Sequence, residues 1–308
     1  VKSSGYTAEY GGALGGVVNV MTKSGTNAFR GSALFNWQSD KLESSYRPIL
    51  RRDVLDNSKA QYWTYPEDKY NRIEPGIAIG GPLVKDKMWF FGAYQPALTT
   101  TKRTVNPTTS GNPNATTFSD ITQKNNAQYF TANSTAQIGS KIRTRVSYNN
   151  SWSKRTGLLP AQSGTDPTWA VYDIDQIQPN WSLSGNLDWV TTPNLYFGFR
   201  GGYYMSDLKN DGVPDTIRYL YSRGNVGLAG VPSNFQAASG FSNVPTNNSA
   251  NKDKQTRAYF QADATWYVNA AGQHTFKGGL QIDRVGNDVD SGELKNLVRL
   301  QWNASLSG

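Results

Sequence analysis

The chain has 308 residues, no cysteine and a formal net charge of +8, with a mean hydropathy of −0.59. The lack of cysteine excludes a disulfide framework and a thiolate metal site, and no apolar run approaches the roughly 18 residues of a membrane helix. Basic residues are scattered over loop-like and polar stretches. This distribution favours a solvated surface or an anion-attracting interior over nucleic-acid binding.

In chain order, a glycine-rich stretch is followed by segments in which apolar and polar residues alternate. A period of two is typical of a β-strand whose two faces meet different surroundings. The predicted strands lie at 28–38, 71–81, 88–99, 127–138, 141–154, 180–191, 194–207, 256–268 and 273–286, and another begins near Leu297.

The connections between these segments alternate in length. The long ones are rich in Asn, Ser, Thr, Gly and Pro and lie at 39–70, 100–126, 155–179 and 208–255. The short ones carry turn residues and lie at 82–87, 139–140, 192–193 and 269–272. Outer-membrane barrels have this rhythm. We therefore predict an all-β, antiparallel transmembrane β-barrel with short periplasmic turns and long extracellular loops.

The alternation also predicts what each face of a strand touches. Leu183, Phe260 and Ala262 lie on apolar faces, which we expect to meet lipid. The opposite faces carry ions and amides and are predicted to face the barrel lumen. The candidate lumen-facing residues are Arg143, Arg145, Asn186, Asp188, Arg200, Asp263, Lys277, Gln281 and Asp283.

Aromatic residues gather near the predicted strand ends. Trp89, Trp189, Trp266 and Phe276 lie beside short turns, and Trp152, Trp181 and Tyr203 lie beside long loops. Amphipathic rings favour the level of the lipid headgroups, which predicts two aromatic girdles. The alternative is that aromatic residues are simply good strand formers.

About nine or ten strands with unpaired edges would leave backbone polar groups unsatisfied in lipid. We therefore expect the chain to be part of a larger barrel. The glycines near the start, Gly11, Gly12, Gly15 and Gly16, do not predict a dinucleotide site. They precede a β-branched run, whereas a dinucleotide fingerprint follows a strand and opens a helix.

Residues 15–23 read Gly-Gly-Val-Val-Asn-Val-Met-Thr-Lys and lead through Ser-Gly-Thr-Asn at 24–27 to Phe-Arg-Gly-Ser at 29–32. Together with the run from Gly80 to Gly92, this pattern resembles TonB-dependent outer-membrane receptors of the Oar-like branch. The motifs cover only a small part of the chain, and the rest matches in strand pattern alone.

The resemblance implies a barrel of about 22 strands filled by a plug domain. Residues 1–27 would be the end of the plug and its linker, and residues 28–308 would be the first part of the barrel. The plug motif would comprise Gly15, Gly16, Asn19, Thr22 and Lys23. The lumen-facing residues would contact the plug or line the solute path, although generic solvation of the wall explains them equally well.

The resemblance also implies a location in the outer membrane of a Gram-negative bacterium, with the lipid bilayer, the periplasmic protein TonB and an extracellular ligand as partners. The function would be uptake of a bulky solute, such as a siderophore, glycan or peptide, with no cofactor. Ligand capture is predicted for Tyr62, Trp63, Tyr65 and the 208–255 loop. The alternatives are a structural or adhesion barrel without active transport, and a soluble glycan-binding β domain.

Catalysis and metal binding have little support in the sequence. The single histidine, His274, follows a predicted turn, where a polar residue is common. Asp207, Asp211 and Asp215 could offer oxygen ligands to Ca²⁺, but their spacing does not match an EF-hand loop. We therefore expect a protein that is not an enzyme.

Overall fold

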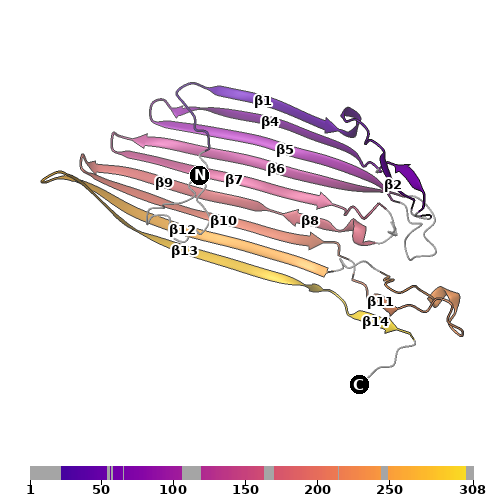
Figure 1. Ribbon diagram of the computed structural model, residues 1–308. Helices are drawn as coiled ribbons and strands as arrows, with labels where there is room; N and C mark the ends of the chain where they lie inside the picture. Colours follow the sequence, from indigo (N-terminus) through magenta and orange to yellow (C-terminus); the bar gives the residue numbers. More distant parts are fainter. Residues whose placement is uncertain are drawn as a thin grey trace, which may run out of the picture.

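The computed structural model describes residues 22–53, 56, 58–64, 66–105, 119–162, 170–213, 215–243 and 249–302. Its main feature is a ten-stranded sheet in which all paired strands are antiparallel and follow one another in chain order (Figure 1). The strands are β1 (Arg30–Ser39), β4 (Lys69–Val84), β5 (Met88–Val105), β6 (Ser119–Ile138), β7 (Ile142–Thr156), β8 (Asp175–Gln178), β9 (Asn180–Thr192), β10 (Leu195–Asp211), β12 (Ser249–Asn269) and β13 (Gln273–Glu293).

The predicted alternation of connections is confirmed. Short turns at 85–87, 139–141, 193–194 and 270–272 join the strands at one end of the sheet. Two of these turns are made possible by left-handed backbone at Asp86 (φ 62°) and Gly139 (φ 60°). The long connections all lie at the other end, where Figure 1 shows β2 (Ile49–Arg52) and β11 (Arg218–Arg223).

Several strands are longer than the sequence predicts. Both described parts of the predicted loop 100–126 are strand, because β5 continues to Val105 and β6 begins at Ser119. Thr99, Thr100 and Thr101 pair with residues 123–125, as suits β-branched side chains. Lys102 and Asp120 form an ion pair of 2.6 Å between these extended strands. The sequence predicts a loop here because residues 100–126 have the polar composition that is typical of loops.

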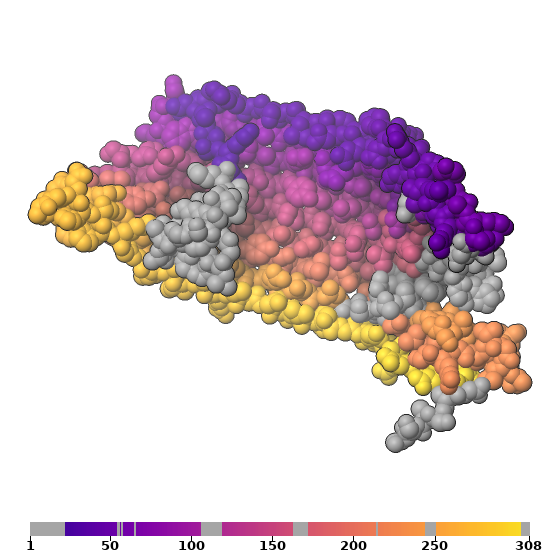
Figure 2. Space-filling model, viewed as in Figure 1, coloured from indigo at the N-terminus to yellow at the C-terminus, as the bar shows by residue number. Residues whose placement is uncertain are grey.

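The segment beginning at Leu297 is a strand, as predicted, but it does not join the large sheet. It forms β14 (Leu297–Gln301), which pairs in parallel with β11 in a separate two-stranded sheet. Figure 2 shows this part projecting beyond the long-connection end of the sheet. The predicted strand is therefore confirmed, and within the described residues its partner is β11.

The predicted loops 39–70 and 155–179 also contain strands. β2 and β3 (Ala60–Trp63) form a small antiparallel hairpin. β8 and β9 both lie between β7 and β10. β8 pairs with the ends of these strands near the long connections, and β9 pairs with the parts nearer the short turns. Pro179 separates the two, and its carbonyl accepts a hydrogen bond of 3.0 Å from the Asp207 amide. Short 3₁₀ helices occupy Asp40–Leu42, Ala170–Asp173 and Ser233–Phe235.

The register separates an apolar face of the sheet from a polar one, because directly paired residues lie on the same side. Leu183 pairs with Tyr203, which pairs in turn with Ala258. Phe260, two residues further along β12, pairs with Ile282. These apolar side chains are not packed into a core: Phe260 is 47% exposed and Ile282 63%. No helix in the described part of the chain is long and apolar enough to cross a membrane.

Aromatic rings form two rows on the apolar face. Toward the long connections, Phe130, Tyr148, Trp181 and Tyr203 follow one another on neighbouring strands, with ring centroids 5.3–6.3 Å apart. Toward the short turns, Trp189 lies beside Phe197, and Trp266 beside Phe276. The rows are about 26 Å apart along the strands at roughly 3.3 Å per residue.

Trp89 is an exception to the prediction for the aromatic residues. It pairs with Thr135, and its neighbour Phe90 pairs with Ser134. The register therefore places Trp89 on the polar face, where its ring nitrogen donates a hydrogen bond to Asn27. The sequence could not assign this face, because Met88, Trp89, Phe90 and Phe91 are all apolar and do not alternate.

Candidate functional site: the N-terminal segment on the polar face

Residues 22–29, which we call the N-terminal segment, run from the start of β1 across the polar face of the sheet (Figures 1 and 2). The segment first contacts β4 and β5 and reaches β6 and β7 at Thr22 and Lys23. It is held at three places along this path.

The first attachment is the side chain of Asn27. Its carbonyl oxygen accepts hydrogen bonds from the Asp86 amide (3.0 Å) and from the Trp89 ring nitrogen (2.7 Å). Its amide nitrogen donates to the Asp86 carboxylate. Both polar atoms of Asn27 are therefore satisfied by the β4–β5 hairpin.

The second attachment is a close backbone approach at Gly25. A Cβ atom at this position would lie 2.2 Å from the carbonyl oxygen of Phe90 and 2.7 Å from that of Gly81. Both contacts are with paired backbone of β4 and β5, which cannot move aside as a side chain could. Only glycine allows the segment to lie this close to the sheet. On the opposite face of the sheet, the Phe29 ring packs edge-on against the Phe90 ring.

The third attachment, which we call the carbonyl clamp, consists of Asn133 on β6 and Arg145 on β7. The Asn133 amide nitrogen donates to the carbonyl of Lys23 (2.6 Å) and to the hydroxyl of Thr22 (3.3 Å). Arg145 donates to the Thr22 carbonyl, to the Thr22 hydroxyl (3.1 Å) and to the Lys23 carbonyl (3.4 Å). The clamp therefore recognises mainly main-chain oxygen atoms.

A cavity of about 560 Å³ opens beside the carbonyl clamp. Thr22 and Ser24 form part of its wall, and polar residues of β7, β9 and β10 form much of the rest. The predicted lumen-facing residues Arg143, Arg145, Asn186, Asp188 and Arg200 all line it. The sequence thus predicted a set of residues that the fold brings together.

Several charged residues on this face form ion pairs across neighbouring strands. Arg200 forms an ion pair of 2.6 Å with Asp263 and lies 3.9 Å from Asp188. Asp283 on β13 pairs with Arg257 at 2.8 Å. Arg143 forms no ion pair with any residue that the structure describes. The cavity is therefore richer in positive than in negative charge.

The remaining predicted site residues lie elsewhere. Lys277 and Gln281 belong to β13, on the same face as Asp283, and Gln281 donates to the Asp283 carboxylate. Tyr62 and Trp63 lie in β3; the Tyr62 side chain is 78% exposed, and the Arg51 guanidinium lies 4.2 Å from the Trp63 ring centre. The predicted residues Gly15, Gly16, Asn19 and Tyr65 lie outside the described residues.

The sequence reasoning missed Gly25, Asn27, Asn133 and Trp89 as site residues. Asn27 lies in the Ser-Gly-Thr-Asn link, which had been noted only as a motif. Asn133 lies in the predicted strand 127–138, and its alternation could have placed it on the polar face. Its contact with Lys23 depends on a chain crossing that no local pattern encodes.

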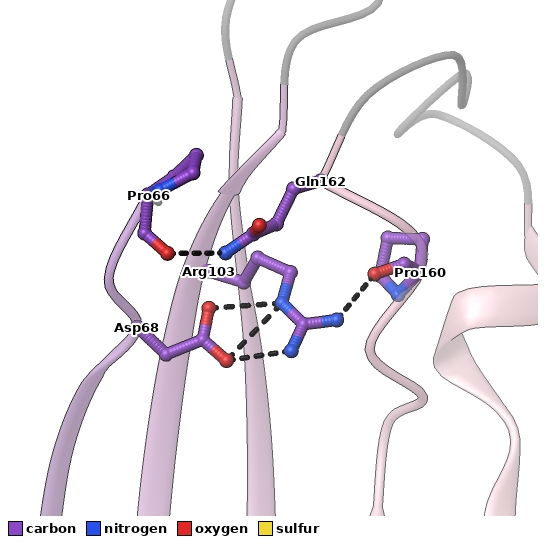
Figure 3. A network of polar contacts seen from close by, with 5 residues as sticks. All are labelled: Pro66, Asp68, Arg103, Pro160 and Gln162. Atoms are coloured by element: carbon purple, nitrogen blue, oxygen red, sulfur yellow. Dashed lines mark hydrogen bonds and ion pairs between the residues drawn. The ribbon is translucent and has the colours of Figure 1, made fainter. Parts of the chain in front are cut away.

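A second polar network joins the long connections (Figure 3). Arg103, near the end of β5, contacts both carboxylate oxygens of Asp68 (2.6–3.2 Å) and donates to the carbonyl of Pro160 (2.6 Å). Gln162 donates to the carbonyl of Pro66 at 2.9 Å. Two long connections are thus tied to each other and to a strand of the sheet. A cavity of about 380 Å³ lies beside this network.

The described residues do not assemble a metal site from three or more His, Cys, Asp or Glu side chains. Asp207 pairs with Lys209, Asp211 accepts from the Gly212 amide, and Asp215 pairs with Lys295. The three carboxylates considered as Ca²⁺ ligands therefore have separate partners. His274 contacts the carbonyl of Ala270 at 3.1 Å beside the turn that precedes β13.

Comparisons with known proteins agree with this architecture. Residues 21–109 match the family described as outer membrane beta barrel domain. A stretch of 99 residues is 34% identical to the TonB-dependent transporter Oar of Myxococcus xanthus, covering 32% of this chain and 9% of that protein. The chain thus spans under a tenth of the length of this relative. No solved structure matches it significantly. The protein lies in the outer membrane, which argues against the soluble glycan-binding alternative.

Proposed function

We propose that this chain is the first part of a closed outer-membrane barrel and that the full-length protein is a TonB-dependent receptor that takes up a bulky solute. In this proposal, residues 1–27 are the end of a plug domain and residues 28–308 begin the barrel wall. The observation that carries the proposal is the N-terminal segment, which lies on the polar face and is held there by Asn27, Gly25 and the carbonyl clamp.

The two faces of the sheet support a barrel. An open sheet of this length would expose Phe260, Leu280 and Ile282 to water on one side, at a large cost in hydrophobic free energy. In a barrel, the same side chains meet lipid between the two aromatic rows. A strand tilt of about 40° reduces the spacing of about 26 Å between the rows to roughly 20 Å, close to the apolar band of such barrels.

The long connections would then face the cell exterior and capture the ligand. Exposed Tyr62 and the cavity beside Arg103 are placed at this end. Aromatic side chains and paired charges suit a glycan, a peptide or a siderophore. The network in Figure 3 would hold the connections in position for capture.

The experiment that tests active transport uses an introduced cysteine, because these 308 residues contain none. Ser184 lines the cavity beside the carbonyl clamp. We expect a Ser184→Cys variant of the full-length protein, in its native outer membrane, to react faster with a membrane-impermeant maleimide when TonB is energised. Deletion of TonB or addition of a protonophore should abolish the increase. Ser58→Cys, in an exposed turn, should react equally under all conditions.

The competing proposal is a barrel that anchors a structural or adhesive surface protein. It predicts that the Ser184→Cys reaction does not depend on TonB, because nothing would be displaced from the lumen. Equal reaction rates with and without TonB, together with normal reaction at Ser58→Cys, would reject active transport and favour the anchor.

A further inference from the structure

The N-terminal segment is attached to the sheet in two chemically different ways. At Gly25 and Asn27 it is fixed to the β4–β5 hairpin beside the strand where it ends. At Thr22 and Lys23 it is held by two side chains from β6 and β7, further across the face. A force applied from the N-terminal side therefore reaches the carbonyl clamp before it reaches Gly25.

The attachment at Gly25 and Asn27 is close-packed and fully satisfied. Main-chain atoms of β4 and β5 surround the Gly25 Cα on the side facing the sheet. Both polar atoms of the Asn27 side chain have partners, and these partners belong to the β4–β5 hairpin. Detachment of Gly25 and Asn27 from the hairpin would break the three hydrogen bonds of the Asn27 side chain and would also remove the backbone packing at Gly25.

The carbonyl clamp is satisfied only in part. Asn133 is 5% exposed and Thr135 is 4% exposed, yet the Asn133 carbonyl oxygen, the Thr135 hydroxyl and the Arg145 Nε have no hydrogen-bond partner among the described residues. Buried polar atoms without partners lower the stability of the state that contains them. Detachment of Thr22 and Lys23 would let water bind these atoms. The free energy gained in this way would offset part of the free energy lost when the hydrogen bonds of the clamp break.

We infer that the carbonyl clamp is a releasable latch and that Gly25–Asn27 is the fixed pivot about which the N-terminal segment moves. The identification of the moving part as a plug rests on the proposed function; the order of detachment does not. Thr22 and Ser24 form a wall of the 560 Å³ cavity, so release of the latch opens this cavity toward β7 and β9. Arg145 and Asn133 are thus positioning residues that hold this wall of the cavity in place.

The test measures detachment without any energy source. In the Ser184→Cys background, de-energised outer membranes containing the full-length protein are treated with the impermeant maleimide. We expect Arg145→Gln to raise the reaction rate at Ser184→Cys by about tenfold, because it removes charged hydrogen bonds to two carbonyl groups. Arg145→Lys keeps a charged donor, although on a shorter side chain than the one whose Nη2 makes all three contacts, and should give a smaller increase.

Two matched controls separate a latch from a general loosening. Arg143→Gln removes an arginine from the same face of the same strand and from the same cavity. Arg143 forms no hydrogen bond or ion pair with residues 22–29, so the rate should stay within about twofold of the parent. Asn27→Ala should also leave the rate within about twofold, because the backbone packing at Gly25 remains.

An Arg145→Gln rate equal to that of Arg143→Gln, or an Asn27→Ala rate as high as that of Arg145→Gln, would overturn the latch and pivot. Failure of Arg145→Gln to assemble would be recognised by the loss of its heat-modifiable gel mobility. Asn133→Ala, which removes the other two hydrogen bonds of the clamp, then takes its place. If the reaction rate of the parent Ser184→Cys protein did not depend on TonB, the transport function would be rejected. The comparison of Arg145→Gln with its controls would still test the latch.

Discussion

The sharpest consequence of the close approach at Gly25 is the effect of adding a single methyl group there. In Gly25→Ala the new Cβ would lie 2.2 Å from the Phe90 carbonyl oxygen and 2.7 Å from the Gly81 carbonyl oxygen, whereas ordinary contacts are about 3.5 Å or longer. The segment would have to move away from the sheet by about 1 Å, since the β4–β5 backbone is held by its own hydrogen bonds.

Overpacking of this kind costs about 1–3 kcal/mol. A middle value of about 2 kcal/mol would increase the population of the detached segment about thirtyfold. The sheet should be unaffected, because the strain is relieved by releasing residues 22–26 and does not require strands to separate. The predicted defect is therefore local detachment without loss of the folded sheet.

Limited trypsin digestion of the full-length protein in membranes would detect this detachment through cleavage after Lys23. Cleavage of a transiently detached segment follows its open population when closing is fast, so Gly25→Ala should be cut about thirtyfold faster. Gly278→Ala is the control, because no atom lies within 4 Å of the position that its added methyl group would take. Equal cleavage rates for Gly25→Ala, Gly278→Ala and the parent would refute the steric argument.

Three further predictions concern the sheet and its long connections. Arg200→Gln leaves the carboxylate of Asp263, whose side chain is 6% exposed, without its cation. The variant should lose its heat-modifiable gel mobility at a lower temperature than the parent. The double variant with Asp263→Asn should recover most of this decrease in temperature. Leu280→Arg on the apolar face should cost about 2–4 kcal/mol and reduce the amount of protein in the outer membrane. Gln281→Arg, one residue away on the polar face, should not. Arg103→Ala should make the connections in Figure 3 more sensitive to protease while the gel mobility of the sheet stays unchanged.

The sequence predicts the two faces of the sheet well, because period-two alternation is a local property of each strand. Arg143, Asp188 and Arg200 could therefore be placed on one face before their strands were paired. The contact of Asn133 with Lys23 could not be predicted, because it depends on residues more than one hundred positions apart in the chain.

Strand length was underestimated for a related reason. Polar strands that extend beyond a membrane have the composition of loops, and only the pairing of Thr99–Val105 with Ser119–Asn125 reveals them as strands. Conversely, the alternation near Leu297 correctly indicates a strand, but its partner is β11 within a long connection. Local periodicity predicts that a strand exists and leaves its neighbour undetermined.

The extra strand length lies almost entirely at the long-connection end of the sheet. β12 begins at Ser249, well before its residue Ala258, which pairs with Tyr203 in the aromatic row. Beyond this level, charged residues occur on both faces, and Lys252 pairs with Asp288 at 3.6 Å. Ions on both faces indicate water on both sides, so this part of the sheet stands outside the apolar band. The long connections are thus carried on a hydrogen-bonded sheet that extends their base away from the membrane. A ligand captured there would meet a surface held in place by strand pairing, with Arg103 fixing the connections to it.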